Sequence, residues 1–265
     1  DGVQLLGGEP TMYAKLSNIL RYCINKKFKT ISLYTNLMFL NEEVFDLIKD
    51  NNITVNTTFY GSSSQVHDKI TQIPNSFDKL MSNAKKLQNA GVKMRVSVLI
   101  MKENENDYTN IVNLLKSLGI TDYHYDEIRK VYKGSQCEHL PEKQRLKLTS
   151  PNFKTNKKIF NMDNSHNTCW YGKIVVSTNG DVFPCVFERN IKYGNVKDNT
   201  LKDIFESNQR KKFWSYSFKY IDKCKDCEYR YACKDCRPVA FAENGNINEK
   251  NPNCTYDPLV GVWNN

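Results

Sequence analysis

The stretch Val92–Ile100 reads VKMRVSVLI and alternates apolar with mostly polar positions along its whole length. A period of two indicates a β-strand that buries one face. We expect its apolar side to face outer helices and its other side to face the inside of a barrel. The two sides consist of Val92, Met94, Val96, Val98 and Ile100, and of Lys93, Arg95, Ser97 and Leu99.

Strands and helices alternate around this stretch, over residues 1–128. Such alternation with short connections predicts an α/β fold of parallel strands with outer helices, as an open sheet or a partial barrel. Further strands are expected at Val3–Leu6, Thr30–Tyr34, Asn52–Phe59 and Tyr123–Ile128, and helices at Glu42–Lys49, Phe77–Leu87 and Tyr108–Leu118. Another helix would bury a face made of Met12, Leu16, Ile19, Leu20, Cys23 and Ile24.

The composition is that of a globular chain of one or two domains, with 265 residues, 40% hydrophobic and 25% charged. No apolar run approaches the ~20 residues of a membrane span, and no export leader is visible. The sequence therefore predicts no membrane partner. The net charge of +9 favours acidic partners without choosing among them.

Most of this charge lies in residues 129–165, which we interpret as a basic linker. Two interpretations stay open, a solvated connection or a docking surface for an acidic peptide. The charge lacks an accompanying groove-entering helix or stacking platform, so no nucleic acid partner is expected.

From residue 166 onward the expected elements are short. A hairpin is expected from Lys173–Ser177 and Val182–Cys185, followed by a helix over Leu201–Lys212. Such short elements bury little core, so covalent or coordinate bonds must hold this part together.

Seven of the nine cysteines can supply those bonds. A large chain without an export signal is more typical of metal binding than of disulfides. Seven thiolates are too many for one tetrahedral ion and suit two sites, of four and three ligands. We prefer iron–sulfur clusters, with two structural zinc ions or disulfides as the alternatives. The residues are Cys169, Cys185, Cys224, Cys227, Cys233, Cys236 and Cys254.

Their spacing resembles the SPASM extension of radical SAM enzymes, C-x(9–15)-G-x4-C, gap, C-x2-C-x5-C-x3-C, gap, C. One spacing differs, because Cys236 follows Cys233 after two residues and not three. Independently, Gly7-Gly8-Glu9-Pro10 after a strand is similar to the GGEP motif of the radical SAM barrel. The resemblance implies a partial (β/α)6 barrel lacking its first strand at 1–128. The linker and a cysteine-rich α+β SPASM domain with two auxiliary 4Fe–4S clusters, at 166–265, would follow.

The family pattern also implies a ligand set for each cluster. Cys224, Cys227, Cys233 and Cys254 would bind the fully ligated auxiliary cluster, and Cys169, Cys185 and Cys236 would bind the other. Residues 160–168 offer no further cysteine, only Asp163 and His166. We therefore hypothesise an open iron at the second cluster, with Cys137 as the rival ligand.

By the same resemblance, Gly7, Gly8, Glu9 and Pro10 would hold the amino group of S-adenosylmethionine (SAM). Thr35 would lie near its carboxylate and Thr58 near its ribose. The alternation described above adds Arg95 and Ser97 as candidate cofactor contacts, unless they are polar residues packed between strand and linker. The C-x3-C-x2-C motif of the SAM-cleaving 4Fe–4S cluster is absent and is expected upstream of Asp1.

The function implied is a maturase that modifies a ribosomally made precursor peptide. A 5′-deoxyadenosyl radical would lead to a thioether or C–C crosslink, and flavodoxin or ferredoxin would be the reductant in the cytoplasm. Three alternatives are formylglycine formation as in anaerobic sulfatase maturases, synthesis of a redox-cofactor precursor, and a non-catalytic electron-transfer or peptide-binding module. Val186 stands where the sulfatase maturases typically carry Asp.

Overall fold

The computed structural model describes residues 1–128, 138–142 and 156–264. These residues form two compact units, the first made of 1–128 with 138–142 and the second of 156–264. The remainder of the basic linker, with Cys137, lies outside the described residues. The extent of the linker therefore stays a prediction, and the two units are described separately.

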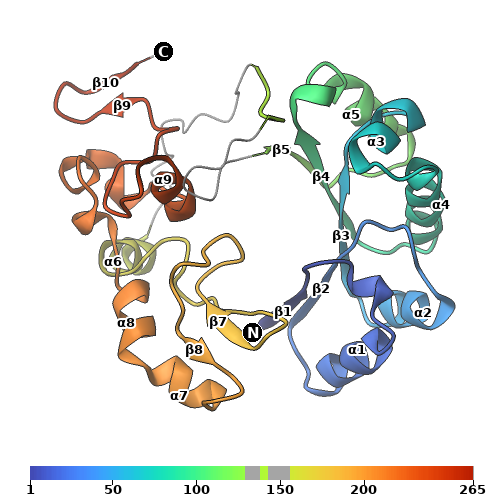
Figure 1. Cartoon of the computed structure of the whole chain (residues 1–265), viewed down its shortest axis with the longest axis horizontal. Coiled ribbons are helices and arrows are strands. Elements are labelled where there is room, and N and C mark those ends of the chain that lie inside the picture. Colours follow the sequence, from blue (N-terminus) through green and yellow to red (C-terminus); the bar gives the residue numbers. More distant parts are fainter. Residues whose placement is uncertain (129–137, 143–155, 265) are drawn as a thin grey trace. The chain divides into compact units, whose positions relative to one another are not determined.

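The first unit is built on a five-stranded parallel sheet in the order β1-β2-β3-β4-β5 (Figure 1). Each strand pairs with the one before it in the chain, as expected for β–α alternation in which short helical crossovers place successive strands side by side. The α/β fold expected from the sequence is thereby confirmed. The strands are β1 (Gly2–Leu5), β2 (Thr30–Tyr34), β3 (Thr54–Phe59), β4 (Met94–Ile100) and β5 (Tyr123–Glu127).

Helices cover one face of this sheet (Figure 1). The apolar side of β4 belongs to that buried face, where Val96 and Val98 are fully buried with Leu80 and Ile111 of the covering helices. The other side of β4 is exposed at Arg95, so the expected direction of this strand is confirmed. The helices are α1 (Leu16–Asn25), α2 (Glu42–Asp50), α3 (Ser64–Thr71), α4 (Ser76–Asn89) and α5 (Tyr108–Ser117).

The first helix begins later than its apolar pattern predicts. Met12 lies in a separate 3-10 turn, η1 (Pro10–Met12), and is 62% exposed, while Ile19 is 37% exposed. Pro10 begins this turn and the Glu9 carboxylate caps it, so local capping prevails over the apolar spacing. Leu16, Leu20 and Cys23 are buried as expected.

Helix α3 was not expected, because its sequence SQVHDKIT has little apolar periodicity. Its one buried residue is His67, whose ring lies between Tyr60 and Phe77. The Tyr60 backbone N–H donates to His67 Nδ1 at 3.4 Å. Burial lowers the pKa of His67, with the nearby Asp68 charge acting in the opposite direction.

We therefore expect acid to weaken the first unit through His67. The unfolded chain takes up a proton near pH 6.5, and the folded state resists it, so stability falls as the pH drops through that value. Hydrogen exchange of α3 and β3 amides between pH 7.5 and 5.5 measures this loss. His67→Gln should flatten the dependence, whereas the same change at exposed His124 should not; equal pH dependence in the wild type and His67→Gln would contradict the assignment.

The second unit consists of short elements. The expected hairpin is confirmed as β6 (Val175–Val176) and β7 (Asp181–Phe183), to which β8 (Gly194–Asn195) adds a third antiparallel strand. Trp170, Val182, Ile204 and Trp214 form its small core. The other elements are α6 (Lys157–Ser165), α7 (Leu201–Glu206), α8 (Asn208–Trp214), η4 (Cys224–Asp226), η5 (Glu228–Tyr231), α9 (Arg237–Asn244), β9 (Tyr256–Asp257) and β10 (Val262–Trp263), with the 3-10 turn η3 (Phe218–Tyr220).

The prediction of a single helix over Leu201–Lys212 is wrong. The chain forms α7 and α8 with a break at Ser207, whose backbone is extended and whose hydroxyl caps α8 by accepting from Arg210 N at 3.2 Å. A serine hydroxyl that satisfies a free helical N–H favours a new helix start over continuation of the old helix.

In the part of the chain that the structure describes, none of the helices has the length and apolar character needed to cross a membrane.

Candidate cofactor and metal sites

The Gly7-Gly8 turn directs Glu9 toward the end of β2. Both glycines adopt left-handed backbone angles, with φ of 93° and 58°, which L side chains rarely tolerate. The turn follows β1, and the Glu9 carboxylate accepts hydrogen bonds from Thr35 Oγ1 at 2.7 Å and from Asn36 N at 2.7 Å. Thr11 adds its N–H at 3.0 Å and its hydroxyl at 2.6 Å.

Thr35 is in turn fixed by the backbone around it. Its N–H donates to the Asn56 carbonyl at 3.0 Å, and its hydroxyl oxygen accepts from Leu37 N at 3.0 Å. The structure therefore brings Glu9 and Thr35 together at the carboxyl ends of β1 and β2, the edge where open α/β sheets bind ligands. An oriented carboxylate at this edge can receive an ammonium group. The SAM contacts of Gly7, Gly8, Glu9, Pro10 and Thr35 stay predictions.

Thr58 and Ser97 are direct neighbours in the register of β3 and β4, and Ser97 is opposite His124 of β5. They form a polar row on the sheet face opposite the covering helices. Arg95 lies one row nearer the amino ends of the strands, where Nε is 3.7 Å from an Asp122 carboxylate oxygen. The expected cofactor roles of Thr58, Ser97 and Arg95 are untested and stay predictions.

In the second unit, three of the four cysteines that the family pattern assigns to one cluster have buried thiols. Burial, followed by the charge of Asp235, raises the pKa of Cys224 and of Cys233 to about 12. Burial also raises the pKa of Cys227. The binding of one cluster by these three cysteines and Cys254 stays a prediction.

Cys169 and Cys185 are two of the three cysteines that the family pattern assigns to the other cluster. Burial, followed by charge on Cys185, raises the pKa of Cys169. The Cys169 backbone N–H donates to Asn167 Oδ1 at 2.9 Å, and Phe187 N donates to Cys185 Sγ at 3.4 Å. Cys236 precedes the first turn of α9, and its place with these two sulfurs stays a prediction.

The donors that the cysteines offer are thiols. The eight described cysteines are free thiols. Within residues 1–128, 138–142 and 156–264, no three Cys, His, Asp or Glu side chains converge on a position for one metal ion. Thiolates are the ligands of 4Fe–4S clusters, which take one on each iron.

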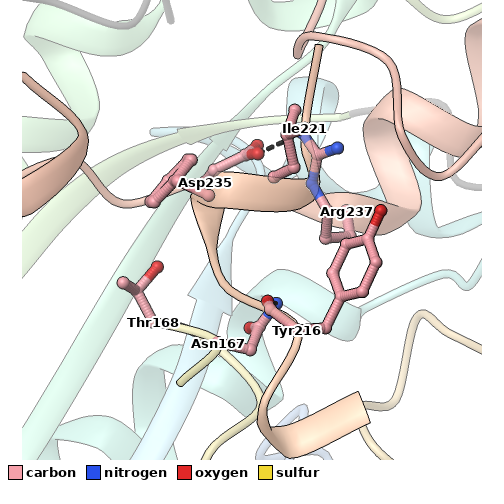
Figure 2. A pocket seen from close by; sticks show the side chains of 7 residues that line it. Asn167, Thr168, Tyr216, Ile221, Asp235 and Arg237 are labelled. Atoms are coloured by element: carbon pink, nitrogen blue, oxygen red, sulfur yellow. Dashed lines mark hydrogen bonds and ion pairs between the residues drawn. The ribbon is translucent and has the colours of Figure 1, made fainter. Parts of the chain in front are cut away.

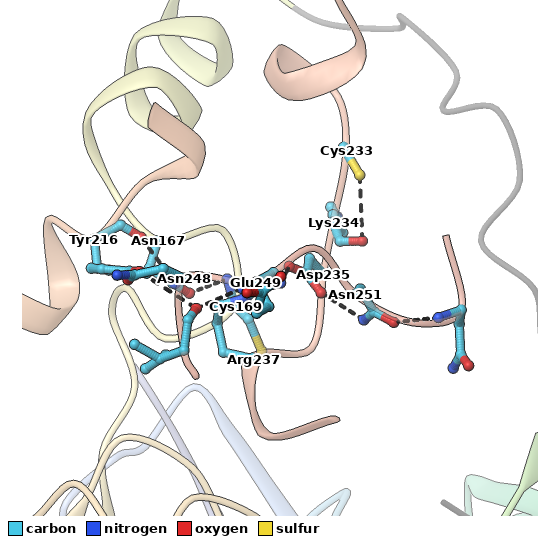
Figure 3. Close-up of polar contacts among 12 residues, drawn as sticks. Asn167, Cys169, Tyr216, Cys233, Lys234, Asp235, Arg237, Asn248, Glu249 and Asn251 are labelled. Atoms are coloured by element: carbon cyan, nitrogen blue, oxygen red, sulfur yellow. Dashed lines mark hydrogen bonds and ion pairs between the residues drawn. The ribbon is translucent and has the colours of Figure 1, made fainter. Parts of the chain in front are cut away.

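A buried polar network, which sequence reasoning missed, begins in the segment that carries Cys233 and Cys236. Asp235 and Arg237 form an ion pair, with side chains 5% and 1% exposed (Figure 2). Arg237 also donates to the carbonyls of Ile247 and Glu249, both at 2.7 Å, and Asn251 Nδ2 donates to Asp235 Oδ1 at 2.7 Å (Figure 3). The pair borders a small cavity. Arg237 Nε is buried and has no hydrogen-bond partner among the described residues.

Comparison with known families finds a match in each unit. The model of the radical SAM superfamily matches residues 1–115, and that of the iron–sulfur cluster-binding SPASM domain matches residues 169–228. The chain belongs to the radical SAM superfamily. More specifically, it is a radical SAM enzyme with a SPASM domain, whose cofactors are SAM and 4Fe–4S clusters.

Three relatives differ in what they make. An AdoMet-dependent heme synthase of Oleidesulfovibrio alaskensis is 21% identical over 95% of this chain and 74% of its own. The antilisterial bacteriocin subtilosin biosynthesis protein AlbA of Bacillus subtilis is 26% identical over 88% of this chain and 56% of its own. A cysteine-type anaerobic sulfatase-maturating enzyme of Clostridium novyi is 25% identical over 87% of this chain and 71% of its own. Sequence reasoning did not anticipate the heme synthase.

The fold agrees with solved structures. SuiB of Streptococcus suis bound to S-adenosylmethionine has a TM-score of 0.72 and 18% identity, over 96% of this chain and 66% of that chain. SuiB bound to the precursor peptide SuiA has a TM-score of 0.68 and 19% identity, over 92% and 62%. At this identity, the likeness shows the fold.

Proposed function

We propose that this enzyme modifies a ribosomally made precursor peptide and closes a thioether or C–C crosslink in it. The observation that carries the proposal is the match of residues 169–228 to the SPASM domain, on a chain whose first unit presents Glu9 at the carboxyl edge of the sheet. Relatives of this architecture include AlbA, which serves subtilosin biosynthesis, and SuiB, which was solved with a precursor peptide.

Each part of the chain has a distinct task in this proposal. SAM, when bound and reduced, supplies the 5′-deoxyadenosyl radical. Glu9 and Thr35 would orient its amino-acid end, and the polar row of Thr58 and Ser97 would line the face beside it. Iron–sulfur chemistry carries the hard step, so the chain's own contribution is position and exclusion of water.

The positive charge of the basic linker would attract the precursor peptide. Lys157 and Lys158, at the start of α6, are exposed, and an acidic leader would be attracted by these and the neighbouring basic residues. We further propose flavodoxin or ferredoxin as the reductant and a reducing, cytoplasmic setting, because thiolate-bound clusters are oxygen-sensitive.

The test is mass spectrometry of short peptides encoded beside the gene, after anaerobic incubation with reconstituted full-length enzyme, SAM and dithionite. A crosslink should lower the peptide mass by two hydrogens, and Glu9→Gln enzyme should leave the peptide unchanged. Formation of 5′-deoxyadenosine without a change in any such peptide would refute the proposal.

A second candidate is heme formation, favoured by three heme synthases that align with 95–96% of this chain. The same enzyme, supplied with an iron porphyrin in place of peptide, tests it. Conversion of that macrocycle, with every neighbouring peptide left intact, would select this candidate.

A further inference from the structure

The segment between Cys233 and Cys236 carries a charge that neighbours residues of both cysteine groups. Asp235 stands between a cysteine assigned to the four-sulfur set and one assigned to the other set. Together with Arg237 it lines a small cavity that Asn167 and Thr168 also line (Figure 2), and the Cys169 backbone N–H donates to Asn167 Oδ1 at 2.9 Å. One carboxylate is therefore close to residues of both groups.

The contacts of Asp235 hold this charge in place. Asn251 donates to Oδ1 (Figure 3). The Asn251 carbonyl accepts from Cys254 N at 3.0 Å, so the carboxylate is connected to the last cysteine of the four-sulfur set. Arg237 holds Oδ2 and also holds the segment at Ile247 and Glu249. A buried acid with two oriented partners keeps its charge and its position.

We propose that the buried Asp235–Arg237 pair is an electrostatic element shared by the two auxiliary cluster sites, which sets their reduction potentials together. The net charge around an iron–sulfur cluster is one determinant of its potential. Asp235 opposes the arrival of an electron and Arg237 favours it. Because both charges neighbour residues of both groups, each shifts the two potentials in the same direction and so sets how difficult the two clusters are to reduce.

The structure supplies a matched control in the same unit. Asp222 and Lys225 also form an acid–base pair, 3.6 Å apart, but their side chains are 61% and 52% exposed. Water and salt screen an exposed pair far more than a buried one. The same charge changes made in the two pairs therefore separate the effect of burial from the effect of net charge.

The experiment is an anaerobic redox titration of the reconstituted full chain, followed by electron paramagnetic resonance, together with iron analysis. Asp235→Asn, which keeps an oxygen for Asn251, should raise both auxiliary potentials. Arg237→Gln should lower both, and Arg237→Lys should restore values close to the wild type. Asp222→Asn and Lys225→Gln should shift neither potential by more than a small fraction of these changes.

Three results would overturn the proposal. The first is unchanged potentials in Asp235→Asn with full iron content. The second is a loss of iron from this variant in which the remaining clusters keep their wild-type potentials or no cluster remains. Either case would give the residue a purely structural role. The third is a shift as large in Asp222→Asn. The titration contains no substrate, so its outcome is independent of whether the enzyme modifies a peptide.

Discussion

Replacing Cys254 with alanine should remove one auxiliary cluster and leave the other, a loss of about four iron atoms per chain. The SPASM pattern assigns Cys254 to one cluster with Cys224, Cys227 and Cys233, and burial raises the pKa of Cys224 and of Cys233 to about 12. A thiol binds iron after it loses its proton, so buried thiols with raised pKa values depend on the complete iron site. Iron analysis and Mössbauer spectroscopy of anaerobically reconstituted protein measure the loss.

Cys23→Ala is the matched control, because Cys23 is a buried thiol of the first unit whose pKa is raised by burial. It should retain all iron. Cys169→Ala should remove the other cluster and spare the one that Cys254 serves. Full iron in Cys254→Ala, or complete loss of iron from either single variant, would show that the cysteines are not divided as proposed.

Glu9→Gln should weaken SAM binding by roughly 10- to 100-fold, the loss expected when a hydrogen bond to a charged group becomes a neutral one. The glutamine keeps the size of the side chain and, with its oxygen in the place of Oε1, the hydrogen bonds from Thr11 and Thr35, so that only the bond from Asn36 N is lost. The turn should therefore survive while the attraction for the ammonium group of SAM is lost. Anaerobic equilibrium dialysis of labelled SAM with the reconstituted enzyme measures the change.

The control for this change is Glu43→Gln, at an exposed carboxylate of the same unit that pairs with Arg21. It should bind SAM like the wild type. Thr35→Val offers a second route to the same site, because it removes the hydroxyl that donates to Glu9 Oε1. An unaltered dissociation constant in Glu9→Gln would remove Glu9 from the SAM site.

The sheet could be predicted from sequence because its signals are local. Each expected strand of the first unit appears within two residues of its expected bounds, since apolar runs between turn residues decide strands directly. Helix α3 escaped notice because its stability comes from one buried histidine and not from an apolar face. The break at Ser207 was not predicted. A serine within a helical pattern is a cap only when its backbone is extended, and the sequence pattern does not reveal the backbone conformation.

The spacing of the cysteines predicts that they are ligands, which stays a prediction, but it gives no information about the residues that surround them. Asp235 and Arg237 read as ordinary charged residues of a polar loop, and their burial depends on partners 10 to 16 residues further along the chain. Contacts of this kind leave no periodic trace in the sequence. The same holds for the placement of Glu9 against Thr35, 26 residues apart, which followed from family resemblance and not from periodicity.

The sequential strand order of the first unit has a consequence for biosynthesis. Because β1 to β5 add one after another at the same growing edge, every new strand finds its neighbour already synthesised. The nascent chain can therefore dock one β–α unit at a time as it leaves the ribosome, without waiting for a distant partner segment. Apolar strand faces would then spend little time uncovered, which limits aggregation before iron is inserted.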